Sequence, residues 1–284
     1  MDSLKNILCP VDFSASSYDA VEKASFLAQL LRADLTLLHV VSVLPQSFGV
    51  VYGLDLDSQN LVADAETKIR ELLRQVKQRY VPYVVSCKSV IREGRVADEI
   101  IAQASESQTD LIIMATHGLH LSESISTVIS HAPCPVVAFQ RLPSEEGVLE
   151  QHKGFRKILI PIDAEHPAKG IAELEGQVGR YLGMMSPEVV LLSVLQPGSL
   201  PEQQRYVQTL LETEGQLLVN EGVHKVTVKV MEGKGLGDHI GRLALLEGCD
   251  LILMQAGVPD AHDPRMALTQ HVVSSARVPV FALR

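Results

Sequence analysis

The chain has 284 residues, of which 46% are hydrophobic and 21% charged; this is the length of two ordinary domains and the composition of a folded protein rather than a disordered one. Its formal net charge of −9 at pH 7 argues against nucleic acid and against an anionic membrane surface as partners, because both attract basic proteins. No apolar run approaches the roughly 20 residues that a membrane-spanning helix needs, and no signal peptide precedes the first predicted strand, so we expect a cytoplasmic protein.

Residues 1–141 alternate short strand patterns with helical patterns, and we predict that they form a first domain. Strands are predicted at Asn6–Val11, Asp34–Val40, Tyr83–Ile91, Asp110–Ala115 and Pro135–Gln140. Apolar residues three or four positions apart predict helices that start near Ser14, Gln59 and Val96. Residues 41–58 have no clear period and are predicted to be a loop. Because the strands are apolar with little alternation, we expect a parallel sheet covered by helices on both faces, a doubly wound α/β fold.

The polar segment Leu142–Gly154 is predicted to be a linker, and residues 155–284 a second domain with the same plan. Its strands are predicted at Lys157–Ile162, Glu188–Leu195, Lys225–Met231, Asp250–Gln255 and Pro279–Arg284. Helices are predicted at about Pro167–Leu182 and Pro201–Asn220, followed by a short helix that ends at Leu246 and a last helix before the final strand.

The two predicted domains are also related in sequence. Lys5–Asp12 returns as Arg156–Asp163, Asp110–Met114 as Asp250–Met254, and Pro135–Phe139 as Pro279–Leu283. A spacing this long indicates a duplicated domain, because solenoid repeats span roughly 20 to 50 residues. We therefore expect two tandem five-stranded domains, in which differences between the copies are informative.

Three motifs carry a resemblance to a known family. The first predicted strand ends in Pro-Val-Asp-Phe-Ser at Pro10–Ser14, the fourth in Met-Ala-Thr-His-Gly at Met114–Gly118, and His-Ala-Pro-Cys-Pro-Val-Val follows at His131–Val137. With matching strands in both halves, the whole chain resembles two tandem copies of the universal stress protein family. The resemblance implies an adenine-nucleotide alpha-hydrolase-like fold, in which nucleotide-binding members hold ATP at the carboxyl ends of strands one and four.

The resemblance also implies which residues line a nucleotide crevice. An aspartate after strand one contacts the adenine or ribose, and a loop of pattern G-x-x-G-(nine residues)-G-[ST] after strand four wraps the phosphates, because glycines let backbone N–H groups approach them. The matching positions are Asp12, Val40, Gly94, Ala115, His117, Gly118 and Ser122 in the first half, and Asp163, Gly233 and Gly257 in the second. ATP or another adenine nucleotide is the cofactor that these positions imply.

The phosphate loop of the first half departs from the family pattern. Ala115 replaces the first glycine, and several residues are missing between Gly118 and Ser122. Glu123 then places a carboxylate at the helix start, where it repels phosphate. We therefore expect no tight binding of ATP in this half.

The loop of the second half departs in a different way. Met266-Ala267 replaces the Gly-Ser pair, and Asp260 and Asp263 add negative charge that Arg265 does not obviously offset. The adenine end of each crevice is kept in sequence and the triphosphate end is degenerate in both.

Two groups of side chains leave a metal site open as an alternative. They are His117, His120 and His131 in the first half, and Asp260, His262, Asp263 and His271 in the second. We favour the other interpretation, in which they are loop residues and a histidine at a helix C-terminus, because the two groups do not correspond between the halves. We therefore predict no metal.

Other candidate residues have more than one interpretation. The repeated Glu93-Gly94 and Glu232-Gly233 pairs either contact a ligand or form tight strand-to-helix turns. The cysteines lack CxxC spacing and are predicted to be reduced and mostly buried thiols. No hydrolase elbow, Walker loop or HExxH motif is present, so we predict no catalytic residue and leave weak ATP hydrolysis as the one activity open.

The fifth strands, Pro135–Gln140 and Pro279–Arg284, are expected to form apolar sheet edges that need cover. Members of the resembled family pair such edges across a dimer, so we expect the two domains to pair through them about a pseudo-two-fold axis, with room for a homodimer of whole chains. The sequence favours a tandem universal stress protein that acts as a non-catalytic regulator through an unidentified protein partner. The alternatives are a module that senses a nucleotide or another small ligand, and a weak ATPase.

Overall fold

The computed structural model describes residues 4–42, 61–116, 124–139, 155–163, 186–220, 222–234, 236–257 and 263–283. The chain divides into two compact units, an N-terminal unit Leu4–Cys134 and a C-terminal unit that starts at Pro135. Most of the predicted loop at 41–58, the predicted linker at 142–154 and the helix predicted near 167–182 lie outside the described residues.

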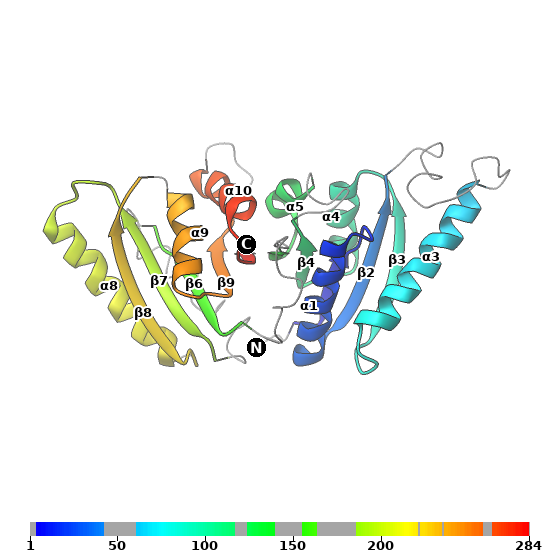
Figure 1. Ribbon diagram of the computed structural model, residues 1–284, viewed down its shortest axis with the longest axis horizontal. Coiled ribbons are helices and arrows are strands. Elements are labelled where there is room, and N and C mark those ends of the chain that lie inside the picture. The colour runs from blue at the N-terminus through cyan, green and yellow to red at the C-terminus, as the bar shows by residue number, and fades with distance from the viewer. Residues whose placement is uncertain are drawn as a thin grey trace. The chain divides into compact units, whose positions relative to one another are not determined.

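The N-terminal unit is a four-stranded parallel sheet in the strand order β3-β2-β1-β4 (Figure 1). Its strands are β1 (Asn6–Pro10), β2 (Asp34–Val41), β3 (Cys87–Glu93) and β4 (Leu111–Ala115). Its helices are α1 (Ala15–Leu31), α3 (Leu61–Tyr80), α4 (Val96–Glu106) and α5 (Ile125–His131). Helices α1 and α3 touch each other and pack on one face of the sheet, and α4 and α5 touch each other on the other face.

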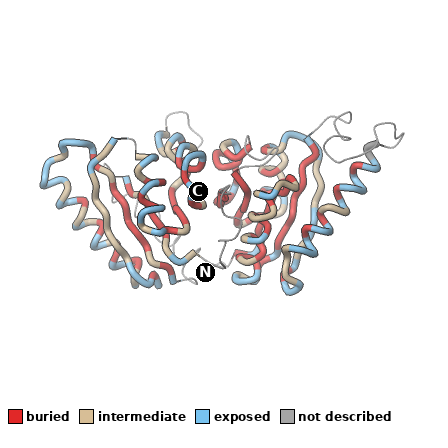
Figure 2. Tube along the Cα trace, viewed as in Figure 1, coloured by how far each residue is buried: buried red, intermediate tan, exposed pale blue. Residues whose placement is uncertain are grey.

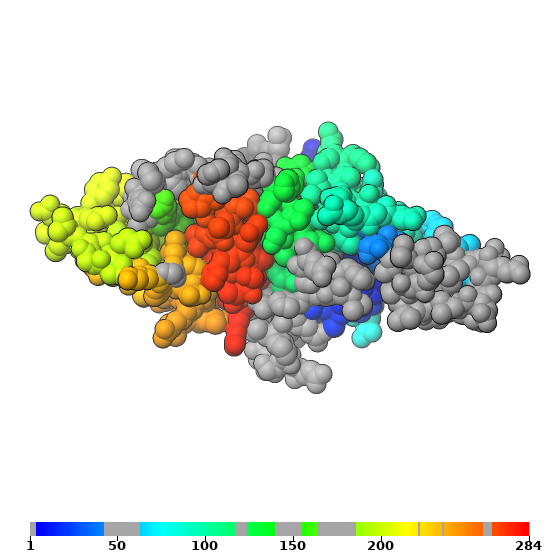
Figure 3. Space-filling view, turned by 90° about the horizontal axis from the view of Figure 1, so that it is seen from above, coloured from blue at the N-terminus to red at the C-terminus, as the bar shows by residue number. Residues whose placement is uncertain are grey.

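The C-terminal unit has the strand order β5-β10-β9-β6-β7-β8. Its strands are β5 (Val136–Phe139), β6 (Lys157–Pro161), β7 (Glu188–Leu195), β8 (Lys225–Glu232), β9 (Leu251–Gln255) and β10 (Val280–Leu283). Its described helices are α8 (Pro201–Asn220), α9 (Leu236–Leu246) and α10 (Pro264–Ser275). All of the pairs with a described register are parallel except β5 with β10, which are antiparallel. Figure 3 shows α9 and α10 against each other, in orange and red.

The internal repeat is visible in the topology, because β3-β2-β1-β4 in one unit matches β8-β7-β6-β9 in the other. A repeated aspartate fixes the same junction in both units. The carboxylate of Asp110 accepts hydrogen bonds from the backbone N–H groups of Lys5 (2.8 Å) and Asn6 (3.0 Å). Asp250 does the same for Arg156 (2.8 Å) and Lys157 (3.2 Å). The predicted doubly wound α/β fold is confirmed.

Burial follows the strands, as the continuous apolar sequences predict. Strands β2 and β7 are buried along almost their whole length, whereas β3 and β8, at the end of the strand order, are largely half-buried (Figure 2). Among the helices that the structure describes, none is both long and apolar enough to cross a membrane.

One predicted strand begins later than its sequence suggests. Residues 83–86 were assigned to the third strand because they are rich in β-branched and aromatic side chains, but β3 begins at Cys87. The N–H of Val85 closes a turn on the carbonyl of Pro82 (3.0 Å), and Tyr83 and Val84 are exposed. Tyr83 and Val84 take the two central positions of this turn, and the turn overrides their local strand propensity.

Candidate functional site

The chain order of the strands defines where a crevice can form in each unit. In the N-terminal unit β1 lies between β2 and β4, so the chain leaves β1 toward one side of the sheet and later returns to the other. Ligands of open parallel sheets bind at the carboxyl ends of the strands at such a switch point. Asp12 follows β1, and Thr116 follows β4. In the C-terminal unit β6 and β9 form the equivalent switch point.

Asp12 is held by the start of helix α1. Its side chain is only 7% exposed, and its Oδ1 accepts hydrogen bonds from the backbone N–H of Ser14 (3.0 Å) and from the Ser14 hydroxyl (2.6 Å). Ser14 is in turn the N-cap of α1, because its Oγ accepts from the N–H of Ser17 (3.2 Å). Between the two, Phe13 has a left-handed backbone with φ 64°, which is uncommon for a bulky residue. The aspartate and the helix N-terminus therefore form one preorganised corner.

A buried polar residue on the second strand supports this corner in both units. His39 Nδ1 lies 2.7 Å from the carbonyl oxygen of Val11 and donates a hydrogen bond to it, and the His39 ring packs against Phe13 with centroids 4.5 Å apart. In the other unit the hydroxyl of Ser193 donates to the carbonyl of Ile162 (3.0 Å). Neither His39 nor Ser193 is among the site residues predicted from the sequence. Their shared position next to the end of the first strand was the available signal.

Val40 and the two repeated glycines lie at the ends of the outer strands. Val40 is buried on β2, next to Arg92 of β3 in register. The N–H of Gly94 donates to the carbonyl of Val41 (3.1 Å), and the N–H of Gly233 donates to that of Leu195 (3.0 Å). Both glycines thus extend the sheet ladder into a strand-to-helix turn. Their contact with a nucleotide stays a prediction.

Side chains from the following helices cover these glycines. A β-carbon on Gly94, whose φ is 151°, would meet Glu99 Oε1 at 2.7 Å, and one on Gly233 would clash with the ring of His239. The space next to each glycine is therefore filled from α4 and α9. This arrangement favours the interpretation of Gly94 and Gly233 as residues of tight strand-to-helix turns.

The phosphate end of the first crevice is described only at its beginning. Ala115 and Thr116 are buried at the end of β4, and His117, Gly118 and Ser122 lie outside the described residues. The structure therefore brings the predicted site residues Asp12 and Ala115 to the ends of neighbouring strands, and the predicted loop stays a sequence-based expectation.

At the start of α10, where the sequence predicts the phosphate end of the second crevice, the structure places a carboxylate of the protein itself. Asp263 is the N-cap of α10, and its Oδ1 accepts from the backbone N–H of Arg265 (2.9 Å). The Arg265 guanidinium also binds this carboxylate, with Nη2 3.0 Å from Oδ2. Gly257 has φ 79°, and a β-carbon there would lie 2.9 Å from Asp263 Oδ2. The helix N-terminus, which would attract a phosphate, is therefore already bound to an anion.

The two first-strand aspartates differ in their surroundings. Asp12 is buried, whereas Asp163, after β6, is exposed. The segment after Asp163 lies outside the described residues, so its role in a nucleotide crevice stays a prediction.

The described parts of the two histidine clusters have other partners. His131 Nδ1 donates to the carbonyl of Thr127 (3.0 Å) in the last turn of α5, and His271 Nε2 lies 2.9 Å from Asp238 Oδ1. Within the described ranges, no three His, Cys, Asp or Glu side chains form a group that could hold a metal. His117, His120, Asp260 and His262 lie outside these ranges.

The four cysteines, all of which lie in the described ranges, form no disulfide, and three of them are buried: Cys9, Cys134 and Cys249. Burial raises the pKa of Cys249 to about 11 and that of Cys9 still further. Burial also raises the pKa of the half-buried Cys87, although Lys77 opposes the shift. Because the thiolate is the reactive form, Cys9, Cys87 and Cys249 do not have the character of catalytic nucleophiles.

Comparisons with known proteins agree with this geometry. The model of the universal stress protein family matches residues 3–140. A universal stress protein of Synechocystis sp. is 30% identical over 139 residues, which cover 47% of this chain and 83% of the relative. Universal stress protein A homolog 1 of Coxiella burnetii is 27% identical over 142 residues, which cover 47% of this chain and 94% of the relative.

A solved structure matches the chain over both repeats. The crystal structure of a universal stress protein from Archaeoglobus fulgidus has a TM-score of 0.69 and 17% sequence identity, covering 99% of this chain and 97% of that chain. At this identity the match concerns the fold alone.

Proposed function

Because the chain belongs to the universal stress protein family, we propose that it acts as a non-catalytic regulator of a stress response, with ATP-binding loops that are degenerate in both repeats. In this proposal the protein works by binding a protein partner and not by hydrolysing ATP. The crevices at the ends of strands one and four keep the family scaffold, but they do not hold a triphosphate tightly.

The observation that carries this proposal is the carboxylate of Asp263 at the N-terminus of α10. It accepts the N–H of Arg265 and also binds the guanidinium of that residue, so the nearest cation and a helix-end donor already have a partner. The side chain of Asp263 is only 8% exposed. A phosphate group at the N-terminus of α10 would have to displace this carboxylate or lie close to it. Because like charges at short distance repel each other strongly when they are partly buried, the carboxylate disfavours phosphate binding here.

A second candidate function rests on a different observation, the corner formed by Asp12 and Ser14. Asp12 is buried and fixed by two hydrogen bonds from Ser14 at the switch point of the N-terminal sheet. A preorganised carboxylate at this place suits a donor group of a small ligand, such as a ribose hydroxyl. The alternative is therefore a sensor of a nucleotide or another small ligand in the first repeat. Weak ATP hydrolysis would require a phosphate site in addition.

We also propose that the fifth strands of the two repeats pair with each other, so that each covers the sheet edge formed by the other. Within the C-terminal unit, β5 from the end of the first repeat pairs with β10 of the second, with Phe281 next to Val137 in register. Both side chains are buried. This pairing supports the expected edge-to-edge association through Pro135–Gln140 and Pro279–Arg284.

Native mass spectrometry of freshly purified protein, with and without added Mg·ATP, tests the proposed function. We expect no co-purified adenine nucleotide and no ADP release from added ATP. The variant Asp263→Ser keeps an N-cap hydroxyl and removes the negative charge, and we expect it to gain affinity for ATP by about tenfold, since one like charge at a partly buried site is worth roughly 1.4 kcal/mol or more.

Glu202→Ser, which removes one negative charge from the exposed first turn of α8, is the matched control and should not change ATP binding. A stoichiometric nucleotide in the purified protein would overturn the regulator proposal in favour of the sensor. ADP release above the background of the buffer would favour the weak ATPase.

A further inference from the structure

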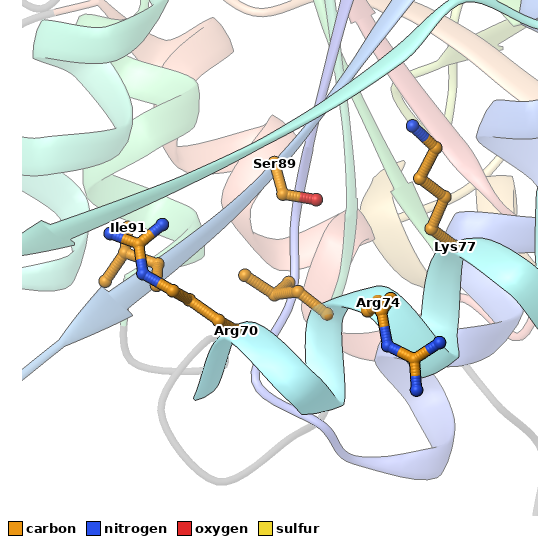
Figure 4. A pocket seen from close by; sticks show the side chains of 6 residues that line it. Arg70, Arg74, Lys77, Ser89 and Ile91 are labelled. Carbon is orange, nitrogen blue, oxygen red and sulfur yellow. The ribbon is translucent and has the colours of Figure 1, made fainter. Parts of the chain in front are cut away.

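A basic hollow lies outside the crevice, between helix α3 and strand β3 (Figure 4). Its volume is about 220 Å³. We call it the basic groove and define it by the residues that line it: Arg70, Leu73, Arg74, Lys77, Ser89 and Ile91. Pockets for nucleotides and other small molecules usually measure about 300–1,000 Å³. The groove is thus better suited to a few side chains of a larger partner than to a whole nucleotide.

The three cations of the basic groove come from one face of α3. Arg70, Arg74 and Lys77 have the spacing i, i+4, i+7, which places them along one helical stripe. Figure 4 shows the Arg70 guanidinium beside Ile91, the Lys77 ammonium reaching toward β3, and the Arg74 guanidinium turned away from the strand. Two fixed positive charges therefore flank the stretch of β3 that contains Ser89.

The internal partners of the two arginines leave their guanidinium groups available. Arg70 binds Glu66 at 2.5 Å, with side chains 67% and 52% exposed, and Arg74 binds Glu71 at 2.8 Å, with 58% and 40%. Exposed ion pairs within one helix contribute little, because water and salt screen them. The guanidinium groups can therefore exchange these carboxylates for those of a ligand.

The outer edge of β3 faces the same region. Strand β3 ends the strand order of its unit, and no described strand pairs with its other edge. On the inner side, Leu35 N–H donates to Ser86 O (2.8 Å) and Gly94 N–H to Val41 O (3.1 Å). Because a parallel ladder uses every second residue of a strand, the backbone groups of Ser89 and Ile91 point outward.

A hydrogen bond from the helix confirms this direction. Lys77 Nζ donates to the carbonyl oxygen of Cys87 at 2.5 Å, which is possible only if this carbonyl points away from β2. The side chains of Ser89 and Ile91 line the basic groove. The strand edge and the cationic stripe therefore form one surface, with backbone donors and acceptors next to positive charges.

The second repeat does not share this surface. The buried positions of α3 correspond in spacing to those of α8, pairing Ala65, Ile69, Leu73 and Val76 with Val207, Leu211, Gly215 and Leu218. In this correspondence the cations Arg70, Arg74 and Lys77 are replaced by Glu212, Gln216 and Val219. Helix α3 carries five basic residues (Lys or Arg) and three acidic residues (Asp or Glu), whereas α8 carries one basic residue and three acidic residues. The fold therefore does not require the basic stripe, and in a chain of net charge −9 it is a local exception.

We propose that the basic groove binds an extended acidic peptide segment of a protein partner, which adds to the outer edge of β3 and places its carboxylates on Arg70 and Lys77. The main-chain hydrogen bonds of such strand addition supply affinity, and alternate side chains supply specificity. Arg–carboxylate pairs are among the stronger polar contacts of this kind. This inference deepens the proposed regulator function by naming the chemistry of its partner, and it rests on that function.

The test uses the full chain and a fluorescein-labelled peptide of alternating Val and Glu, which exposes all carboxylates on one face when extended. Fluorescence anisotropy should show saturable binding at low salt that weakens as salt rises. The peptide with Lys in place of Glu should not bind. The double variant Arg70→Glu/Lys77→Glu should weaken binding of the acidic peptide by about tenfold or more, because each reversal replaces attraction by repulsion.

Two matched variants separate the groove from general charge effects. Lys68→Glu/Arg79→Glu makes the same change in charge on α3 outside the groove and should alter the affinity less than about threefold. Ser89→Pro removes an outward N–H without removing a bond to β2 and is tolerated at an edge, so it should weaken binding while circular dichroism shows a folded protein.

The proposal is overturned if the peptide does not bind, if both charge variants lose affinity equally, or if Ser89→Pro binds like the parent. It is also overturned if sedimentation shows self-association that Arg70→Glu/Lys77→Glu abolishes, since the occupant is then a second copy of the chain. Failure of peptide binding leaves the regulator proposal intact, whereas a co-purified nucleotide overturns the regulator proposal without affecting peptide binding.

Discussion

The carboxylate of Asp12 has a structural role that does not depend on any ligand. The same oxygen, Oδ1, accepts from the backbone and from the hydroxyl of Ser14, and that hydroxyl caps α1. An aspartate kept after the first strand in both repeats can thus be retained for the strand-to-helix corner alone. Retention in sequence is therefore weak support for a nucleotide in the first repeat, and the two roles need separate measurements.

Stability measurements distinguish the structural role of Asp12. We expect Asp12→Ala and Ser14→Ala each to lower the free energy of unfolding by about 1–2 kcal/mol, because both remove the hydrogen bond from Ser14 Oγ to Asp12 Oδ1 and each removes one further bond at the helix N-terminus. For that reason the double variant should lose clearly less than the sum of the two single losses. Urea unfolding followed by circular dichroism measures all three. Full additivity would show that the corner is not a unit.

Measurements of ligand affinity test the other role of Asp12, which is to bind a small ligand. If the first repeat is a sensor, Asp12→Ala should abolish small-ligand binding, while Ser14→Ala should only weaken it. Equal affinities in the parent and in Asp12→Ala would leave the aspartate with a structural role.

The sequence predicted some residues of the site well and others not at all. Asp12 was identified through the resemblance to the family, in which an aspartate follows the first strand, and the apolar run before it is a local signal that locates that strand. The cap formed by Asp263 was not foreseen, since a carboxylate can cap a helix, bind a nearby arginine or repel a phosphate, and only three-dimensional position decides among these. His39 was missed as a support for the corner because its partner, the carbonyl of Val11, is a backbone group that no sequence pattern marks.

At the scale of elements, one arginine of β3 forms two ion pairs with α4. Arg92 Nε lies 2.5 Å from Glu99 Oε2, and Arg92 Nη1 lies 2.8 Å from Glu106 Oε2. The side chains of Arg92 and Glu99 are 24% and 22% exposed, so this pair is better shielded than the ion pairs on α3, whereas Glu106 is 61% exposed. In register the second repeat has Met231 at this position, opposite Val194, as Arg92 is opposite Val40. One repeat therefore joins helix to strand by charge, and the other has an apolar residue there.

Exchange of Arg92 for the residue of the other repeat should make stability less dependent on pH. Arg92 holds the pKa of Glu106 below its usual range, so this pair stabilises the fold above the unfolded pKa of about 4.3 and stops doing so as the pH falls through the lower folded value. We expect Arg92→Met to lower the urea midpoint at pH 7, and the difference from the parent to shrink by pH 3.

A neighbouring arginine provides the control for this prediction. Arg95 is 90% exposed and lies 3.7 Å from Asp98, so Arg95→Met should leave the midpoint nearly unchanged at both pH values. A difference between Arg92→Met and the parent that is as large at pH 3 as at pH 7 would mean that packing, and not charge, explains the loss.

The elements themselves could be predicted because their signals are local. Apolar runs fixed the position of β1, β2 and β4 to within a residue or two, as buried parallel strands are continuous in hydrophobicity. The error at Tyr83 arose where propensity and turn chemistry conflict, since β-branched residues there follow a proline. The basic stripe of α3 was not identified, because charged residues on an amphipathic helix usually mean only a solvated face, and the edge position of β3 was needed to give it meaning.

For the whole molecule, the C-terminal unit contains a strand from the first sequence repeat. Strand β5 is the last strand of the first repeat in sequence but pairs antiparallel with β10, and the division into compact units falls at Pro135. A duplicated chain can thus be cooperative across its repeat boundary, because residues of one copy complete the sheet that contains the other.

Hydrogen exchange can test whether β5 is an integral part of this unit. Val137 is fully buried and lies next to Phe281 in register, so Val137→Asp buries an unpaired charge and should destabilise the unit by about 3 kcal/mol or more. Exchange measured by mass spectrometry should then accelerate in β10. The same replacement at Val84, which is 74% exposed, should change stability by less than about 0.5 kcal/mol. Unaltered exchange in β10 with faster exchange confined to β5 would mean that β5 is only an appendage, and that each repeat completes its sheet without the other.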